Sequence, residues 1–79
     1  MTWLHELHAG EWARIVSIDA DDLMTHKIRS AGLNEGRVIK MVSRCGLLTC
    51  RFHTKTFSMS SGIAQQIRVV TLSSPQIGA

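Results

Sequence analysis

The spacing of apolar residues changes at residues 31–36, whose sequence is AGLNEG. Before this point Met24, Ile28 and Ala31 recur at positions i, i+4 and i+7, which places them on one face of a helix. After it, apolar residues become closely spaced in the manner of a strand. The pattern therefore predicts a helix that leads directly into a β-hairpin.

The predicted helix carries residues that favour both of its ends. Asp21 or Asp22 can act as the N-cap, because a carboxylate accepts hydrogen bonds from free backbone N–H groups. Gly32 follows the last periodic residue and can adopt the left-handed conformation that closes a helix, with Leu33 as the accompanying apolar contact. Residues 34–36 then reverse the chain.

Short strand patterns occupy most of the remaining chain. In the first strand Ala13 and Ile15 share a face while Ile18 is out of phase, so we expect a bulge near residues 16–17 that bends the strand. The expected strands cover residues 12–19, 37–44, 47–52, 56–59 and 67–72, the helix covers 22–31, and a capped helical turn covers 60–66. The fold class is mostly β: a small SH3-like five-stranded barrel with one inserted α-helix and a short helical turn before the last strand.

The length of 79 residues suits one domain, expected at residues 1–72, with a disordered tail at 73–79. The longest run without Asp, Glu, Lys or Arg covers residues 56–67, which is too short and too polar to span a bilayer. The N-terminus lacks the apolar stretch of a secretory signal. Two cysteines are too few for a disulfide scaffold, so the expected compartment is the cytoplasm.

Charge is distributed unevenly along the chain. Residues 1–26 hold one base and five acids, whereas residues 27–79 hold eight bases and one acid. The basic half suits an acidic protein or a nucleic acid as partner, although solvated strand positions explain the same residues. The basic residues expected on strands are Arg37, Lys40, Arg44, Arg51, Lys55 and Arg68.

Three motifs follow one another along the chain: LxxGExAxI at residues 7–15, KIxxAGLxxG at 27–36 and IAxxIxV at 63–69. In this order they resemble the FeoA family, small cytoplasmic accessory proteins of bacterial ferrous-iron uptake, over about residues 4–72. Glu35 stands where the family often has proline, and Ser60 where it often has a basic residue. The second departure removes a positive charge before the last helical turn.

The resemblance implies an adaptor or regulator, not an enzyme, whose partner is the cytoplasmic part of the ferrous-iron permease FeoB, a membrane protein with a GTPase domain. It also implies that the fold recurs as the C-terminal domain of metal-dependent repressors. The residues agree, since the sequence contains no P-loop, GxGxxG motif or EF-hand. We therefore expect no catalytic residue, no cofactor, no small-molecule substrate and no direct membrane insertion.

Histidine and cysteine supply metal-ligand types, but their spacing gives no convincing tetrahedral site. His5 and His8 are three residues apart, and so are Cys50 and His53. Cys50 falls on the apolar face of its strand, where a small core residue is the expected role. We therefore predict no metal ligand among them.

Partner binding is expected to use the helix side and the edge at Trp12. Trp12 is a candidate anchor, because a thin core has difficulty enclosing both indoles of the chain; alternatively it covers the helix. Met24, Ile28 and Leu33 would line a groove between helix and barrel, or equally form the core there. His26 is expected beside this surface, exposed to solvent.

Nucleic-acid binding through the basic strand face is the alternative function. Base stacking needs exposed aromatic rings among the basic residues, and the strands offer only Phe52 and Phe57, with Phe52 on the inward face. Docking on the permease is therefore preferred. The basic half remains a second possible docking surface.

Overall fold

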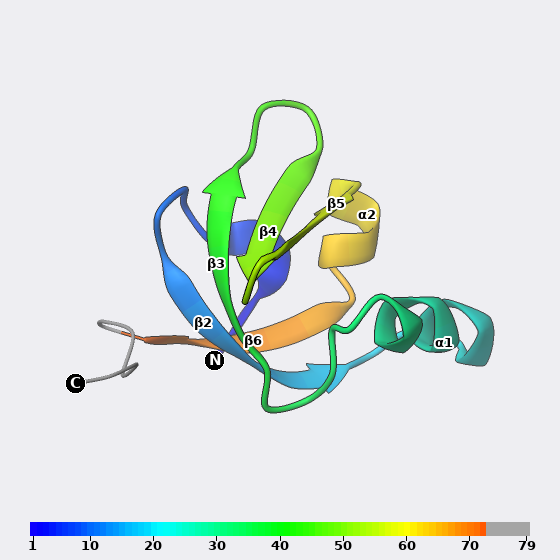
Figure 1. The fold of residues 1–79 in the computed structure, drawn as a ribbon. Coiled ribbons are helices and arrows are strands. Elements are labelled where there is room, and N and C mark those ends of the chain that lie inside the picture. The colour runs from blue at the N-terminus through cyan, green and yellow to red at the C-terminus, as the bar shows by residue number, and fades with distance from the viewer. Residues whose placement is uncertain (73–79) are drawn as a thin grey trace.

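The computed structural model describes residues 1–72, which form one antiparallel sheet with two helices (Figure 1). The strands are β1 (Thr2–Trp3), β2 (Trp12–Ile18), β3 (Val38–Ser43), β4 (Leu48–Phe52), β5 (Lys55–Met59) and β6 (Ile67–Leu72). The helices are α1 (Asp22–Ser30) and α2 (Ser61–Ala64), and a 3-10 turn, η1 (Leu4–Glu6), precedes β2. The predicted mostly-β fold, with an inserted helix and a short helical turn before the last strand, is confirmed.

The sheet has six strands in the order β1-β6-β2-β3-β4-β5, one more than predicted. The additional strand is β1, whose two residues were not expected in a strand. Two residues carry no alternation that a sequence pattern can detect, and their strand character comes from pairing with β6. Because β1 and β5 are the edges of the described sheet, it curls around the core without closing into a complete barrel.

β2 bends at a bulge in the predicted place. Its pairing with β6 shifts register between Ile15 and Ser17, which leaves Val16 exposed on the outer face. Ala13 and Ile15 point inward and are buried. β2 pairs with β3 through residues 12–14 and with β6 on its other edge, and the bulge adds bend and twist with which the sheet curls.

α1 has the predicted ends. The Asp21 carboxylate accepts a hydrogen bond from the backbone N–H three residues later, at 2.7 Å. At the other end Gly32 has φ +101°, its N–H donates to the Arg29 carbonyl at 2.9 Å, and the N–H of Leu33 donates to the Ile28 carbonyl at 3.2 Å. These two bonds satisfy carbonyls that the end of the helix would otherwise leave free.

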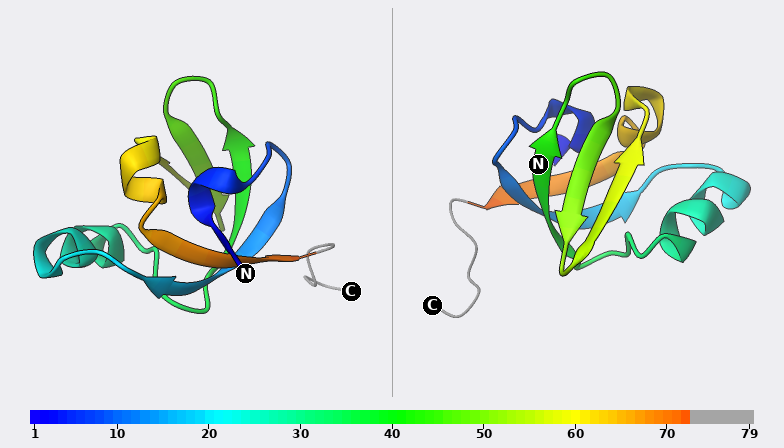
Figure 2. Two further views of the ribbon diagram at one scale, coloured as in Figure 1. Left: turned by 180° about the vertical axis from the view of Figure 1, so that it is seen from behind. Right: turned by 45° about the horizontal axis from the view of Figure 1, so that its top comes forward.

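The buried apolar residues form one core cluster between the curled sheet and the helical segments. α1 reaches it through Ile28, which is buried, and through Met24, which is half-buried against it, while the rest of α1 projects from the sheet (Figure 1). η1 and α2 lie beside each other and cover one end of the core, to which Leu4 and Ala64 contribute (Figure 2).

Within residues 1–72 no helix is long and apolar enough to cross a membrane. The tail predicted at 73–79 lies outside the described residues.

Candidate functional site

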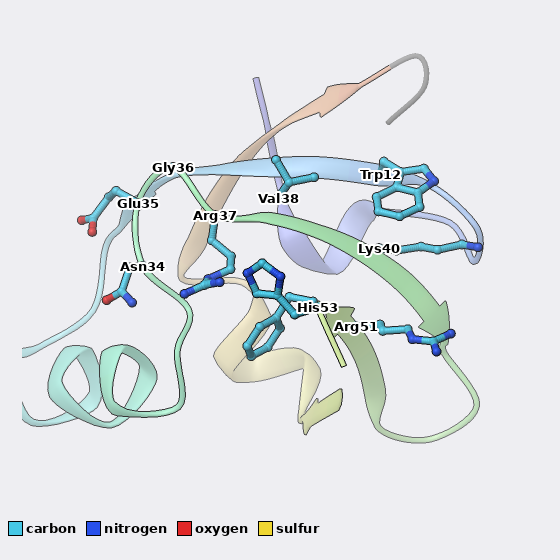
Figure 3. A pocket seen from close by; sticks show the side chains of 10 residues that line it. Trp12, Asn34, Glu35, Gly36, Arg37, Val38, Lys40, Arg51 and His53 are labelled. Carbon is cyan, nitrogen blue, oxygen red and sulfur yellow. The ribbon is translucent and has the colours of Figure 1, made fainter. Parts of the chain in front are cut away.

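An open groove of about 810 Å³ lies on the outer side of β2, β3 and β4 (Figure 3). Trp12 and Lys40 lie at one end of it, Asn34 and Glu35 at the other, and Arg37 and His53 between them. Aromatic, basic and turn residues line it: Trp12, Asn34, Glu35, Gly36, Arg37, Val38, Lys40, Arg51, Phe52 and His53.

Strand register assembles one end of the groove. Trp12 of β2 is directly opposite Lys40 of β3, and Lys40 is directly opposite Arg51 of β4. Residues that face each other across an antiparallel pair share one face of the sheet. Ala13 and Cys50 are buried, and they neighbour Trp12 and Arg51 in sequence. Successive side chains of a strand point to opposite faces, so Trp12, Lys40 and Arg51 lie on the outer face.

The groove contains two cation–π pairs, in each of which a basic group lies over an aromatic ring. The Lys40 Nζ is 5.5 Å from the centre of the Trp12 ring, and the Arg37 Cζ is 5.2 Å from the centre of the Phe52 ring. Trp12 is half-buried, and Phe52 is only 5% exposed. Cations at this distance are attracted to the negative face of a ring, so both basic groups are held over the groove.

The turn after α1 positions the Arg37 side chain. Its Nε donates a hydrogen bond to the Gly32 carbonyl at 2.8 Å. Gly32 itself lies against Phe52, because a Cβ added there would be 3.0 Å from the Phe52 Cε2. The helix end, the β4 aromatic ring and the groove cation therefore form one packed unit.

The groove has a positive character. Lys40 and Arg51 make no ion pair within residues 1–72. Glu35 is the lining acid, and its carboxylate is bound to the Arg29 guanidinium at 2.7 Å. The field of the groove is consequently set by Arg37, Lys40 and Arg51.

The structure separates the five residues that were expected to bind a partner. Trp12 lines the groove, whereas Ile28 and Leu33 are 2% and 0% exposed in the core and Met24 is half-buried against it. The predicted groove between helix and barrel is therefore closed core at Ile28 and Leu33. His26 is exposed on α1, beyond the opposite end of β2 from Trp12, so the two do not share a surface. Their docking roles stay predictions.

The sequence predicts which basic residues lie on strands, but not how they are arranged in the groove. Lys40 and Arg51 were recognised as strand residues with positive charge, but their alignment with Trp12 depends on the register of three strands. β2 and β3 are separated in sequence by α1, and the β3–β4 hairpin shifts register between Met41 and Ser43, so neither register follows from the pattern within one strand. The available signal was the alternation of apolar and polar residues within each strand. It indicates which face of the sheet a residue occupies, but not which residue of the next strand lies beside it.

Histidine and cysteine do not come together in the described part of the chain. No group of three His, Cys, Asp or Glu residues within 1–72 could hold a metal ion. The His8 Nδ1 lies 3.2 Å from the Glu11 Oε1, and His53 is exposed at the turn after β4. Cys50 is buried as predicted, and this burial raises the pKa of its thiol to about 11.

The family model of the FeoA domain matches residues 2–71. A crystal structure of an iron uptake regulatory protein (FeoA) matches with a TM-score of 0.84 and 24% identity, over 90% of this chain and 96% of that one. The solution structure of FeoA from Chlorobium tepidum gives a TM-score of 0.84 and 21% identity, over 98% and 76%. A manganese-dependent transcriptional repressor is similar over 89% of this chain but 41% of its own, with 26% identity and a TM-score of 0.80. No curated protein sequence matches the chain.

Proposed function

Because this chain belongs to the FeoA family, whose members are non-catalytic accessory domains of ferrous-iron transport, we propose that it is a cytoplasmic adaptor that docks on the permease FeoB. Contact with the cytoplasmic part of the permease would regulate or stabilise transport without a reaction on this chain. The surface proposed for docking is the groove of β2, β3 and β4.

The observation that supports this surface is the alignment of Trp12, Lys40 and Arg51 across three strands. Tryptophan and arginine are enriched among the residues that dominate binding energy at protein interfaces. Trp12 is half-buried, so its ring is held in place before a partner arrives and less conformational entropy is lost on binding. The groove thus offers a fixed apolar anchor with cations beside it.

The groove is preferred over the exposed side of α1 as the docking surface. α1 presents Leu23, which is 67% exposed, and His26, but it follows the end of β2 that is remote from Trp12. Figure 3 shows α1 near Asn34 and Glu35, on the other side of the view from Trp12. A partner anchored on Trp12 would therefore contact the basic strands before it contacts the helix.

Binding to the purified cytoplasmic part of the permease tests the proposal. We expect Trp12→Ala to weaken binding by about tenfold or more, since loss of an anchor costs over about 1 kcal/mol. Trp3→Ala is the matched control, because Trp3 is the other half-buried indole and lies outside the groove. Trp3 is on β1, and its ring lies under the guanidinium of Arg68 on β6. Circular dichroism melts verify that both variants fold. Failure of the wild-type chain to bind would refute the proposed function.

A further inference from the structure

We propose that the groove recognises an acidic segment of the partner, in which carboxylates pair with Lys40 and Arg51 while an adjacent apolar side chain packs on Trp12. This inference rests on the proposed docking function and adds the chemistry of the segment that is bound.

Uncompensated charge in the sheet is the first argument for an acidic segment. Lys40 and Arg51 are directly opposite each other on β3 and β4, and like charges in this position repel. Arg37 adds a third positive charge to the lining. An anion bound between them would attract both side chains and so offset the repulsion between them.

Five of the chain's own acids are engaged elsewhere, and the sixth, Asp22, lies in the first turn of α1. Of its six acidic residues, five make local contacts away from Lys40 and Arg51. Glu6 and Glu11 bind backbone N–H groups of the N-terminal segment, Asp21 caps α1, Asp19 pairs with Arg68, and Glu35 pairs with Arg29. The compensating carboxylates would therefore come from another molecule.

The aromatic residues favour a peptide over a nucleic acid. Single-stranded nucleic acids bind when bases stack on free aromatic faces. Here Lys40 lies over the face of the Trp12 ring, where a base would stack, and Phe52 is buried beneath Arg37. An apolar side chain of a peptide needs only the part of the half-buried indole that Lys40 leaves exposed. Carboxylates need no free ring, because the guanidinium of Arg51 can donate two parallel hydrogen bonds to one carboxylate.

The strand spacing sets the length of the segment. Two intervals between neighbouring strands separate β2 from β4, which gives a span of about 10 Å. About three residues of extended chain cover this span. A short stretch with two acidic residues beside one apolar residue is consequently sufficient to reach Trp12, Lys40 and Arg51 together.

Charge reversal tests the inference on the full chain with the cytoplasmic part of the permease. We expect Lys40→Glu and Arg51→Glu each to weaken binding by about tenfold, and the affinity of the wild type to fall with added salt. Lys27→Glu makes the same change of charge on α1, outside the groove, and should alter affinity less than about twofold. Equal losses in all three variants, or no loss in the groove variants, would overturn the acidic-segment inference and leave docking itself intact.

A peptide titration keeps this test independent of the permease. Amide spectra of the 15N-labelled chain are followed while a synthetic peptide with one leucine followed by two glutamates is added, in the order of Trp12, Lys40 and Arg51 across the strands. We expect shifts to be largest at Trp12, Lys40 and Arg51 and to disappear in Arg51→Glu. A peptide with glutamines in place of the glutamates should cause no shift. Equal shifts with both peptides, or stronger binding of an oligothymidine to the same residues, would overturn the inference.

Discussion

Gly32 lies against the ring of Phe52, so closely that a Cβ at this position would be 3.0 Å from the Phe52 Cε2. The same glycine has φ +101° and ends α1, and its carbonyl accepts the hydrogen bond from the Arg37 Nε. Phe52 in turn lies beneath the Arg37 guanidinium. One residue therefore joins the end of the helix, the core and the lining of the groove.

Substitution of Gly32 should destabilise the domain for two separable reasons. A side chain at positive φ costs about 1 kcal/mol, and the contact with Phe52 should raise the loss for Gly32→Ala to about 2 kcal/mol or more. Gly46→Ala is the matched control, because Gly46 also has positive φ, at +85°, but has open space where its Cβ would lie. Urea unfolding measures both variants. Equal losses would show that the contact with Phe52 contributes nothing.

The ends of α1 could be predicted because they depend on neighbours in sequence. Asp21, Gly32 and Leu33 act within one or two turns of the helix, and the phase of Ile18 located the bulge in the same local way. The contact between Gly32 and Phe52 joins segments twenty residues apart and left no sign in the sequence. β1 was missed for the same reason, since only its pairing with β6 makes it a strand.

The candidate site was predictable in composition and not in geometry. Trp12 was a candidate anchor, with the alternative that it covers the helix, and the structure places it in the lining of the groove. Ile28 and Leu33 were placed on the same candidate surface because a helical pattern marks one apolar face without revealing what covers it. Both residues are buried in the core cluster. The neighbours of Trp12 are instead Lys40 and Leu72, which only the strand register reveals.

The two cysteines should differ in reactivity. Cys45 is exposed between β3 and β4, whereas Cys50 is buried and its pKa is raised to about 11, so its thiol stays protonated and inaccessible. One thiol per folded chain should react rapidly with a disulfide reagent at pH 8, and two in denaturant. Cys45→Ser should abolish the rapid reaction, and a rapid reaction that persists in this variant would place Cys50 at the surface.

The raised pKa of Cys50 also gives stability an alkaline dependence. The ordinary thiol pKa is 9.0, so above this pH the unfolded chain loses a proton that the folded chain keeps up to about 11. The contribution of Cys50 is complete below pH 9 and falls as pH rises toward 11, by about 1 kcal/mol near pH 10. Urea unfolding at pH 8 and 10 should show this loss in Cys45→Ser and not in Cys45→Ser with Cys50→Val.

Glu11 should make the stability of the fold decrease at acid pH, whereas Cys50 makes it decrease at alkaline pH. Its pKa is lowered mainly by the hydrogen bond that its carboxylate accepts from the His8 backbone N–H, at 2.6 Å. A lowered pKa stabilises the folded state above the ordinary value of 4.5, and this contribution is lost as pH falls through the folded pKa. Melting temperatures between pH 7 and 3 should fall less steeply in Glu11→Gln. An identical slope in both proteins would contradict this role.

Folding should not require a metal ion. Cys50 lies in the apolar core, and the His8 imidazole faces Glu11 without a third ligand within residues 1–72. Because a structural metal site contributes to folding free energy, prolonged chelation should leave the amide spectrum unchanged. Loss of spectral dispersion on chelation, restored by added metal, would contradict the prediction.

The helix and the strands should contribute unequally to docking on the permease. His26 is exposed on α1 and lies beyond the end of β2 remote from Trp12, so His26→Asp should change affinity by less than about twofold. Arg51→Ala removes a cation from the row that contains Trp12 and should weaken binding by about tenfold. Both positions are exposed in the free chain, so unchanged melting temperatures are expected and a difference in affinity reports the interface. Loss of binding in His26→Asp with full binding in Arg51→Ala would place the partner on α1, where the amphipathic pattern of the sequence first suggested it.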